Sequence, residues 1–236
     1  MYCSLIQQLL GRFGIWGFVV TDSFLEHRSL RELIAQDLRS RILAKDIAPG
    51  DKLDVAGIAS QYGVSSGSVR EAAFLLESEG LVVINPRRGI TVRVVTPTDL
   101  LEIYAVREVI DVAAAILVAA AHNEEQLSRL RTGQERVEQC WDEGGFASGL
   151  AADLEFHVLL AQLSGNSHLL SISMNLTDQT RLHLQPVQAA DASIRKRPPE
   201  HLHASMIDSI VSGDEDSIRG ACASHYAFSR TRLTHE

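Results

Sequence analysis

Apolar residues in the first part of the chain recur at two different spacings, one typical of helices and one of strands. From Ser29 onward, leucine and isoleucine return every three or four residues, which places them on one face of a helix. Two shorter helical stretches follow, Val55 to Gln61 and a segment ending near Glu79, with a "YGV" turn between them. The runs "LVVI" and "ITVRVV", joined by "NPRRG", are rich in β-branched residues and predict a hairpin. Three helices followed by a hairpin form a winged helix-turn-helix, which we expect over residues 26–95.

The starts of these helices carry capping residues. Asp54 is a suitable N-cap for the second helix, and Gly63 in the turn is free to adopt a positive φ. The cap of the third helix has two solutions. Either Ser65 caps it, or Ser68 and Glu71 form a capping box.

Beyond residue 95 the pattern is helical throughout. "VTPTD", residues 95–99, is the expected linker, in which Pro97 ends the strand and Thr98 or Asp99 caps the next helix. Turns are predicted at "EGG", "SGN", "QPVQAAD" and "SGD". The protein is therefore expected to be mainly α, with an all-α helical bundle of about six helices over residues 96–236. The expected helices are Asp99–His122, Glu124–Cys140, Phe146–Leu163, Ser167–Gln185, Pro199–Val211 and Asp214–Leu233.

Composition limits how this chain can meet nucleic acid. Its 236 residues carry a net charge of −8, so any DNA contact must come from a local patch and not from bulk charge. The three cysteines, Cys3, Cys140 and Cys222, form no CxxC pair, which favours a reducing cytoplasm over a disulfide scaffold. Residues 1–25 are apolar but interrupted by polar side chains. We expect an N-terminal extension there, and neither a membrane span nor a signal peptide.

The third helix and the hairpin tip hold the candidate DNA-binding residues. A helix-turn-helix places the N-terminal residues of this helix near the base edges of the major groove. Here the helix begins "SSGSVRE", which offers hydroxyls and one arginine, and the hairpin tip is "RRG". Taken singly, the serines could merely cap a helix and the arginines could simply be solvated. In this order of elements we predict DNA contacts from Ser65, Ser66, Ser68, Arg70, Arg87, Arg88 and Gly89.

These motifs resemble the winged helix of the GntR family of bacterial regulators. The family pattern "PG..L", "LA...GVSR.PVREAL..LE.EGLV" and "..RG..V" appears here as "APGDKL" and "IASQYGVSSGSVREAAFLLESEGLVVINPRRGITV". Two family arginines are missing, because Ser66 follows the "GVS" serine, and Val55 and Ala56 stand where the family commonly has "SER" or "AER". In the family these arginines reach guanine edges. The resemblance therefore implies double-stranded operator DNA as partner, at a site that differs from the usual family operator.

The helical half contains an Asp–His pair in "DLEFH". Asp153 and His157 are four residues apart, so both lie on one face of a helix, as two ligands of one metal would. A lone pair of this kind is more often a surface hydrogen bond. His203 and His225 stand in two later helices among apolar residues, and helices that bring inward-facing histidines together build metal sites in bundle cores.

The second half resembles the FCD ligand-binding domain of the FadR branch of the GntR family. Its landmarks "D..FH..L....GN", "H..(I/M)(L/I)..I..GD" and a final "H" are present over nearly all of residues 98–230. The resemblance implies one divalent ion held by Asp153, His157, His203 and His225, and such a ligand set suits Zn²⁺, Ni²⁺, Mn²⁺ or Fe²⁺. His201 is the main rival to His203. The ordinary histidines are His122, His168 and His183.

Two arginines are candidates for binding an effector. A guanidinium clamps a carboxylate with two parallel hydrogen bonds, and in the family the position of Arg107 often helps to hold an acidic effector. The alternative for Arg107 is a salt bridge to Asp111 or Glu108. Arg181 is the second candidate. The resemblance implies a small organic acid, such as a hydroxy acid, a sugar acid or a dicarboxylate.

The sequence thus predicts a ligand-responsive bacterial transcriptional regulator that binds DNA as a homodimer. Two alternatives stay open at this stage. The bundle could serve dimerisation alone, in an architectural DNA-binding protein. The metal could instead activate a water in a metalloenzyme, although no further carboxylate at a fixed spacing offers itself as general base. We expect no enzyme activity and no membrane partner.

Overall fold

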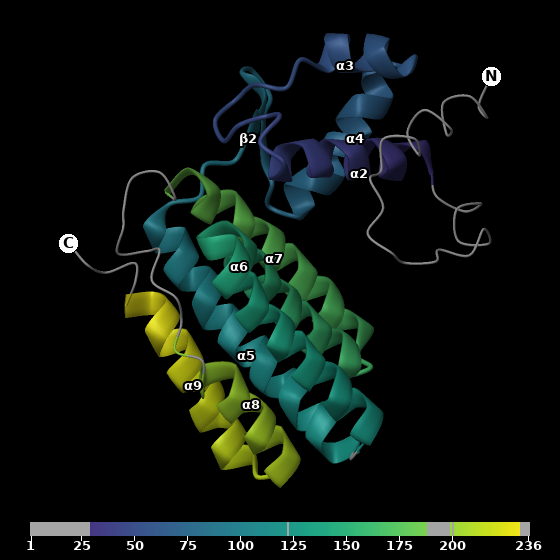
Figure 1. Cartoon of the computed structure of the whole chain (residues 1–236). Coiled ribbons are helices and arrows are strands. Elements are labelled where there is room, and N and C mark those ends of the chain that lie inside the picture. The colour runs from purple at the N-terminus through teal and green to yellow at the C-terminus, as the bar shows by residue number, and fades with distance from the viewer. Residues whose placement is uncertain (1–28, 122, 188–198, 200, 232–236) are drawn as a thin grey trace. The chain divides into compact units, whose positions relative to one another are not determined.

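The computed structural model describes residues 29–121, 123–187, 199 and 201–231 (Figure 1). The chain divides between Val94 and Val95 into two compact units. The expected N-terminal extension, residues 1–25, lies outside the described residues. Within the described ranges every helix is too short or too polar to cross a bilayer.

The first unit has the winged helix-turn-helix order that the sequence predicts. Its core is made by the inward faces of the three helices, with Leu38, Val69 and Leu76 fully buried. The hairpin strands pair antiparallel, with Val82 opposite Val92 and Asn85 opposite Gly89. The elements are α2 (Leu30–Leu43), α3 (Val55–Tyr62), α4 (Ser66–Ser78), β1 (Val82–Asn85) and β2 (Gly89–Val92).

The predicted caps position the helix-turn-helix. The carboxylate of Asp54 accepts a hydrogen bond from the backbone N–H of Gly57 at 3.0 Å, and Gly63 ends α3 with φ of 64°. The hydroxyl of Ser65 accepts from the N–H of Ser68 at 3.1 Å, so Ser65 is the N-cap of α4. Of the two solutions open from the sequence, the Ser65 cap is therefore the one observed.

The hairpin gains a third partner that the sequence pattern does not reveal. The backbone N–H of Gly50 donates to Val92 and that of Leu53 donates to Ile90, both at 2.9 Å. Lys52 forms a bridge to Thr91 in the same stretch. Residues 50–53 therefore run beside β2, and β2 lies between this stretch and β1.

The second unit is a helical bundle, which confirms the predicted fold class. Its long first helix begins at Pro97, and Thr96 and Asp99 exchange hydrogen bonds around its first turn. The prediction that Thr98 or Asp99 caps this helix was wrong, because proline fits the first helical position and moves the cap back to Thr96. The elements are α5 (Pro97–Ala121), α6 (Glu124–Leu163), α7 (Ser167–Val187), α8 (His201–Ser212) and α9 (Glu215–Thr231).

The element α6 consists of two helices that meet at Gly145, where φ is 64° and ψ is −157°. Gln126 donates a side-chain hydrogen bond to the carbonyl of Leu163, and Arg136 pairs with Glu155 at 3.2 Å. These contacts join residues near opposite ends of the element, so its two halves run antiparallel. The predicted turn at "EGG" is therefore present, and six helical segments form the described part of the bundle.

The central position in the bundle belongs to α5, which packs against α6, α7, α8 and α9. Between the helices lies a buried apolar cluster that includes Leu130, Phe156, Leu160, Met206 and Ile210. Side chains that α5 directs inward therefore reach the neighbourhood of four other elements. This arrangement allows residues far apart in the sequence to meet in one interior site.

Candidate functional site

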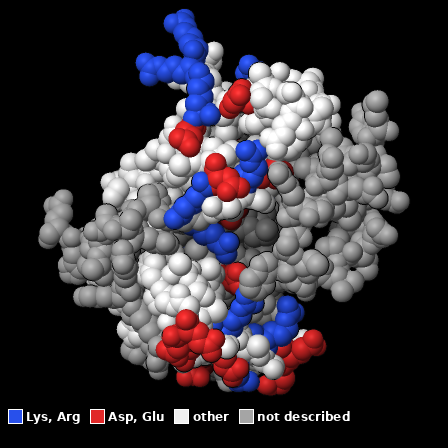
Figure 2. Space-filling model, turned by 45° about the horizontal axis from the view of Figure 1, so that its top comes forward, with Lys and Arg blue, Asp and Glu red and all other residues white. Residues whose placement is uncertain are grey.

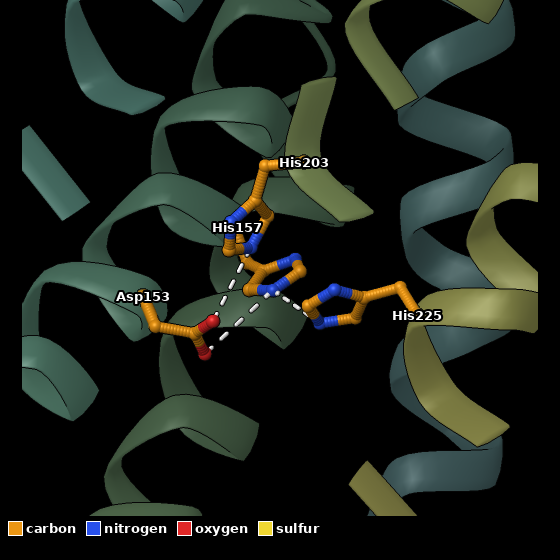
Figure 3. A group of neighbouring side chains, drawn as sticks. All are labelled: Asp153, His157, His203 and His225. Carbon is orange, nitrogen blue, oxygen red and sulfur yellow. Dashed lines mark hydrogen bonds and ion pairs between the residues drawn. The ribbon is translucent and has the colours of Figure 1, made fainter. Parts of the chain in front are cut away.

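Four predicted metal ligands converge inside the bundle. Asp153 and His157 project from the second half of α6, His203 from α8 and His225 from α9 (Figure 3). Each of the four residues is buried, with at most 8% of its surface exposed. One potential ligand atom from each lies within 4.8 Å of the others. The structure thus brings together the set that the sequence predicts.

The distances suit a small divalent ion. The Nε2 atoms of His157 and His225 are 3.1 Å apart, and His203 Nε2 lies 3.2 Å from Asp153 Oδ1. His157 Nε2 is 3.9 Å from Asp153 Oδ2. Ligands bound at 2.0–2.2 Å in tetrahedral geometry stand about 3.4 Å from one another. The residues present therefore fit a bound transition metal.

The local electrostatics favour the ligating forms of Asp153 and His225. Burial alone would raise the pKa of Asp153, but His203, His157 and His225 outweigh it and hold this pKa well below its usual range. Burial lowers the pKa of His225, and the neighbouring His157 and His203 lower it further. A carboxylate and a neutral imidazole are the forms that bind a metal.

Asp111 of α5 orients one of the histidines. Its Oδ2 atom lies 2.7 Å from His157 Nδ1 and accepts a hydrogen bond from the hydroxyl of Tyr226 at 2.5 Å. A carboxylate beside Nδ1 favours the tautomer that leaves the Nε2 lone pair available to a metal. Sequence reasoning treated Asp111 only as a possible partner of Arg107 and missed this role. Its position one turn after Arg107, on the same face of α5, was the available signal.

Arg107 lies buried next to this group, with 3% of its surface exposed. Its guanidinium stands over the ring of Tyr226, 5.8 Å from the centroid. Burial alone would lower the pKa of Arg107, but Tyr226 and Asp111 raise it above its ordinary value. Glu108 pairs with Arg230, and within the described part of the chain Arg107 Nη2 has no hydrogen-bond partner. The guanidinium therefore retains a buried donor for an anion.

Arg181 of α7 is placed less favourably for this role. It lies 3.7 Å from Glu155, a half-exposed residue, and about a third of its own side chain is exposed. Its Nε atom is buried and lacks a hydrogen-bond partner among the described residues. Arg181 thus lies between the bundle interior and the surface.

Two other histidines that the structure describes, His168 and His183, do not join the metal group. His183 is buried and its Nδ1 atom lies 2.5 Å from the carbonyl oxygen of Val95. His168 is exposed at the start of α7. His122 and the side chain of His201 lie outside the described residues.

The candidate DNA-binding residues are all at the surface of the first unit. Ser65, Ser66 and Arg70 are exposed at the N-terminal end of α4, and Ser68 is partly buried. The hydroxyl of Ser65 caps the helix. The exposed hydroxyl of Ser66 is therefore more available than that of Ser65 for a contact with DNA. Exposed side chains at this end of a recognition helix can reach phosphates and base edges.

The hairpin tip presents a compact basic group. Arg87 and Arg88 are exposed, and the backbone N–H of Arg88 closes the turn on the carbonyl of Asn85 at 3.1 Å. Gly89 follows with φ of 92°, a conformation that favours glycine. On the face drawn in Figure 2, basic side chains lie among acidic ones. The two exposed arginines of the hairpin tip thus form a local basic cluster that could contact phosphate.

Lys52 adds a third cation to this group, which sequence reasoning missed. Its Cε atom lies 2.7 Å from the point that a Cβ atom on Gly89 would occupy. The exposed side chain of Lys52 thus runs across Gly89 at the base of the hairpin tip. The pairing of Lys52 with Thr91 places it there, and no local spacing in the sequence indicates it.

Comparison with known proteins agrees with both halves of this description. The domain described as "Bacterial regulatory proteins, gntR family" matches residues 30–92, and the FCD domain matches residues 102–228. The latter covers more than half of the chain. The E. coli protein McbR/YncC has a similar fold, with a TM-score of 0.68 over 87% of this chain and 97% of that chain, at 21% identity.

Relatives in Bacillus subtilis are named as HTH-type transcriptional regulators. YdhC is 30% identical over 142 residues, which span 60% of this chain and 63% of YdhC. LutR is 23% identical over 199 residues, which span 76% of this chain and 90% of LutR. These are regulators and not enzymes, which confirms the prediction against a metalloenzyme. The chain belongs to the GntR family of bacterial transcriptional regulators, in the group that carries an FCD domain.

Proposed function

We propose that this regulator binds operator DNA as a homodimer and senses a small organic acid in its helical bundle with the help of a bound divalent metal. One observation carries the proposal. Three histidines and one aspartate converge in a buried site, next to an arginine whose Nη2 donor has no partner among the described residues. A bundle that served dimerisation alone would not need buried charge of this kind, since unpaired buried charge destabilises a fold.

Asp153, His157, His203 and His225 would hold the ion, and these ligand types suit Zn²⁺, Ni²⁺, Mn²⁺ or Fe²⁺. When bound, the metal supplies Lewis acidity and a coordination position for an effector carboxylate. Arg107 donates hydrogen bonds to the same acid from the side of α5. Arg181 is a weaker contributor because part of its side chain is exposed.

The first unit supplies the DNA contacts. Hydroxyls of Ser65, Ser66 and Ser68 and the backbone at Gly89 approach the duplex, and Arg70, Arg87 and Arg88 neutralise phosphates. Because Ala56 and Ser66 replace the family's arginines, the operator differs from the usual family sequence. Two copies of the unit in a symmetric dimer would read a pseudo-palindromic site in the cytoplasm.

Regulation requires that the acid distinguish two states of the dimer. A ligand that binds the DNA-competent and the DNA-incompetent state equally well does not change the equilibrium between them. We therefore expect the acid to change DNA affinity only when the metal is present.

The test is fluorescence anisotropy with DNA from upstream of the protein's own gene and with shuffled DNA of equal length. Zinc-loaded protein is titrated with and without a panel of small carboxylic acids, then again after EDTA treatment. The proposal expects preference for the upstream DNA, and an acid-dependent change that EDTA or His203→Ala abolishes. DNA affinity that no acid and no chelator changes would instead support an architectural protein.

A further inference from the structure

The exposed face of α4 carries one large apolar side chain, that of Phe74. Its exposed fraction is 58%, and among the described residues it is the only phenylalanine, tyrosine or tryptophan that is exposed. Single apolar residues are common on protein surfaces, so exposure alone assigns no role to this ring. Its position on the helix decides whether it has one.

Phe74 lies on the same face of α4 as the predicted DNA contact Arg70. Four exposed positions of this helix have the spacing i, i+3, i+4 and i+7, and they are Gly67, Arg70, Glu71 and Phe74. Residues three and four apart in a helix are neighbours, so these positions form one stripe over two turns. Homeodomains read the major groove through recognition-helix residues at this same spacing. Phe74 therefore occupies a position from which a recognition helix can reach a base.

The start of α4 allows the helix to come close to a base pair. Ser66 and Gly67 are small residues in its first turn. A Cβ atom added at Gly67 would find Ser65 Oγ, at 3.4 Å, as its nearest atom outside the chain neighbours and the helix backbone. The packing of the unit thus does not require a glycine, which is unfavourable inside a helix. A missing side chain here instead permits close approach of the backbone to a ligand, and this brings the next two turns nearer to the base edges.

The charged neighbours of Phe74 are compatible with such a contact. Arg70 lies one turn before it and supplies positive charge for phosphate. Glu77 is engaged within the unit, because its Oε1 atom accepts a hydrogen bond from the backbone N–H of Ile84 at 2.8 Å. The carboxylate of Glu71 could accept from the amino group of a cytosine. Phe74 is thus the one side chain of the stripe that cannot form a hydrogen bond to a base.

We propose that Phe74 is a specificity-determining residue whose ring contacts the 5-methyl group of a thymine in the major groove of the operator. This methyl group is the apolar feature of the major-groove edge, and phenylalanine is one of the side chains that contact it. The other bases present hydrogen-bonding groups there, which an apolar ring would leave unpaired. The inference rests on the proposed operator binding, and it names one cause of a sequence preference that differs from that of the family.

The test compares thymine DNA with uracil DNA, because the two bases differ only in the 5-methyl group. Full-length protein is titrated by fluorescence anisotropy with DNA from upstream of its own gene, made once with thymidine and once with deoxyuridine at the same positions. We expect the wild type to bind the thymine DNA about fourfold more tightly for one methyl group that the ring covers. Phe74→Ala should lose this preference and keep nearly the same affinity for the uracil DNA.

Control variants distinguish methyl recognition from general affinity and from folding. Val83→Ala shortens another exposed apolar side chain of the same unit, and it should keep the preference of the wild type. Arg70→Gln should weaken binding to both DNAs alike and keep their ratio, because a phosphate contact does not depend on the methyl group. Phe74→Ala should melt at the wild-type temperature or higher, since alanine favours an exposed helix position.

Three results would overturn the inference. The first is a preference for thymine DNA that survives Phe74→Ala, and the second is a wild type that binds the two DNAs equally. The third is an equal loss on both DNAs together with a changed oligomeric state, which would mean that Phe74 packs against protein. If the wild type does not prefer upstream DNA over shuffled DNA, the proposed operator binding itself fails, and this inference fails with it.

Discussion

The two units of this chain present their functional side chains in opposite ways. In the first unit, Arg70, Arg87 and Arg88 are exposed, and each lies close in sequence to the helix start or turn that places it. In the second unit, the metal group is buried and comes from three separate elements. A surface that reads phosphate can be assembled from short local motifs, because its partner brings the opposite charge. A buried charged site needs the whole bundle, because every charge inside it must find a partner within the protein or in a ligand.

The largest effect is expected from removing the only carboxylate of the metal group. Asp153→Ala leaves only the three imidazoles of the group, so metal affinity should fall by more than about 100-fold. Elemental analysis should show loss of bound metal, and zinc should no longer raise the melting temperature of the helical unit. His168→Ala, an exposed histidine in the same unit, should behave like the wild type. Full metal stoichiometry in Asp153→Ala would contradict the assignment of the ligands.

A smaller effect is expected from the carboxylate that orients His157. Asp111→Asn keeps the size of the side chain but loses the charge 2.7 Å from His157 Nδ1. Metal affinity should fall by about 10- to 100-fold, as is usual for partners behind a metal ligand. Glu108→Gln is the matched control, since Glu108 lies on the same helix but pairs with Arg230. Equal losses in the two variants would show that general stability, and not orientation of the histidine, is responsible.

The contrast between the units also explains what the sequence could predict. Helix starts depend on neighbours three residues away, so spacing alone indicated Asp54 and left Ser65 as one of two candidates. Spacing paired the candidate metal ligands Asp153 and His157. Adding His203 and His225 to them took family landmarks, because no local spacing joins these helices. Asp111 and Lys52 were missed. Their roles depend on which helix or strand packs beside them, and this packing is decided by the whole fold.

Alanine substitutions at two glycines of the first unit allow the effect of backbone strain to be distinguished from the effect of side-chain crowding. Gly63 and Gly89 both have positive φ, so alanine at either should cost about 1–2 kcal/mol of stability. At Gly63 no atom lies within 4 Å of the added Cβ, whereas at Gly89 the Lys52 side chain must move. Urea unfolding should therefore show losses in both variants, while DNA affinity should fall only in Gly89→Ala. A similar fall in Gly63→Ala would mean that the fold of the unit as a whole limits DNA binding.

The smallest effect tests whether Lys52 belongs with the hairpin arginines. If Lys52 neutralises a phosphate, Lys52→Gln should lower the slope of log affinity against log salt by about 0.9, as Arg88→Gln should. The loss should be alike on upstream and shuffled DNA, because a phosphate contact carries no sequence information. Arg31→Gln, which removes an exposed cation from α2, serves as the charge-matched control. A slope that Lys52→Gln and Arg31→Gln change equally would reflect net charge alone, and it would restrict the local DNA contact of the hairpin to its two arginines.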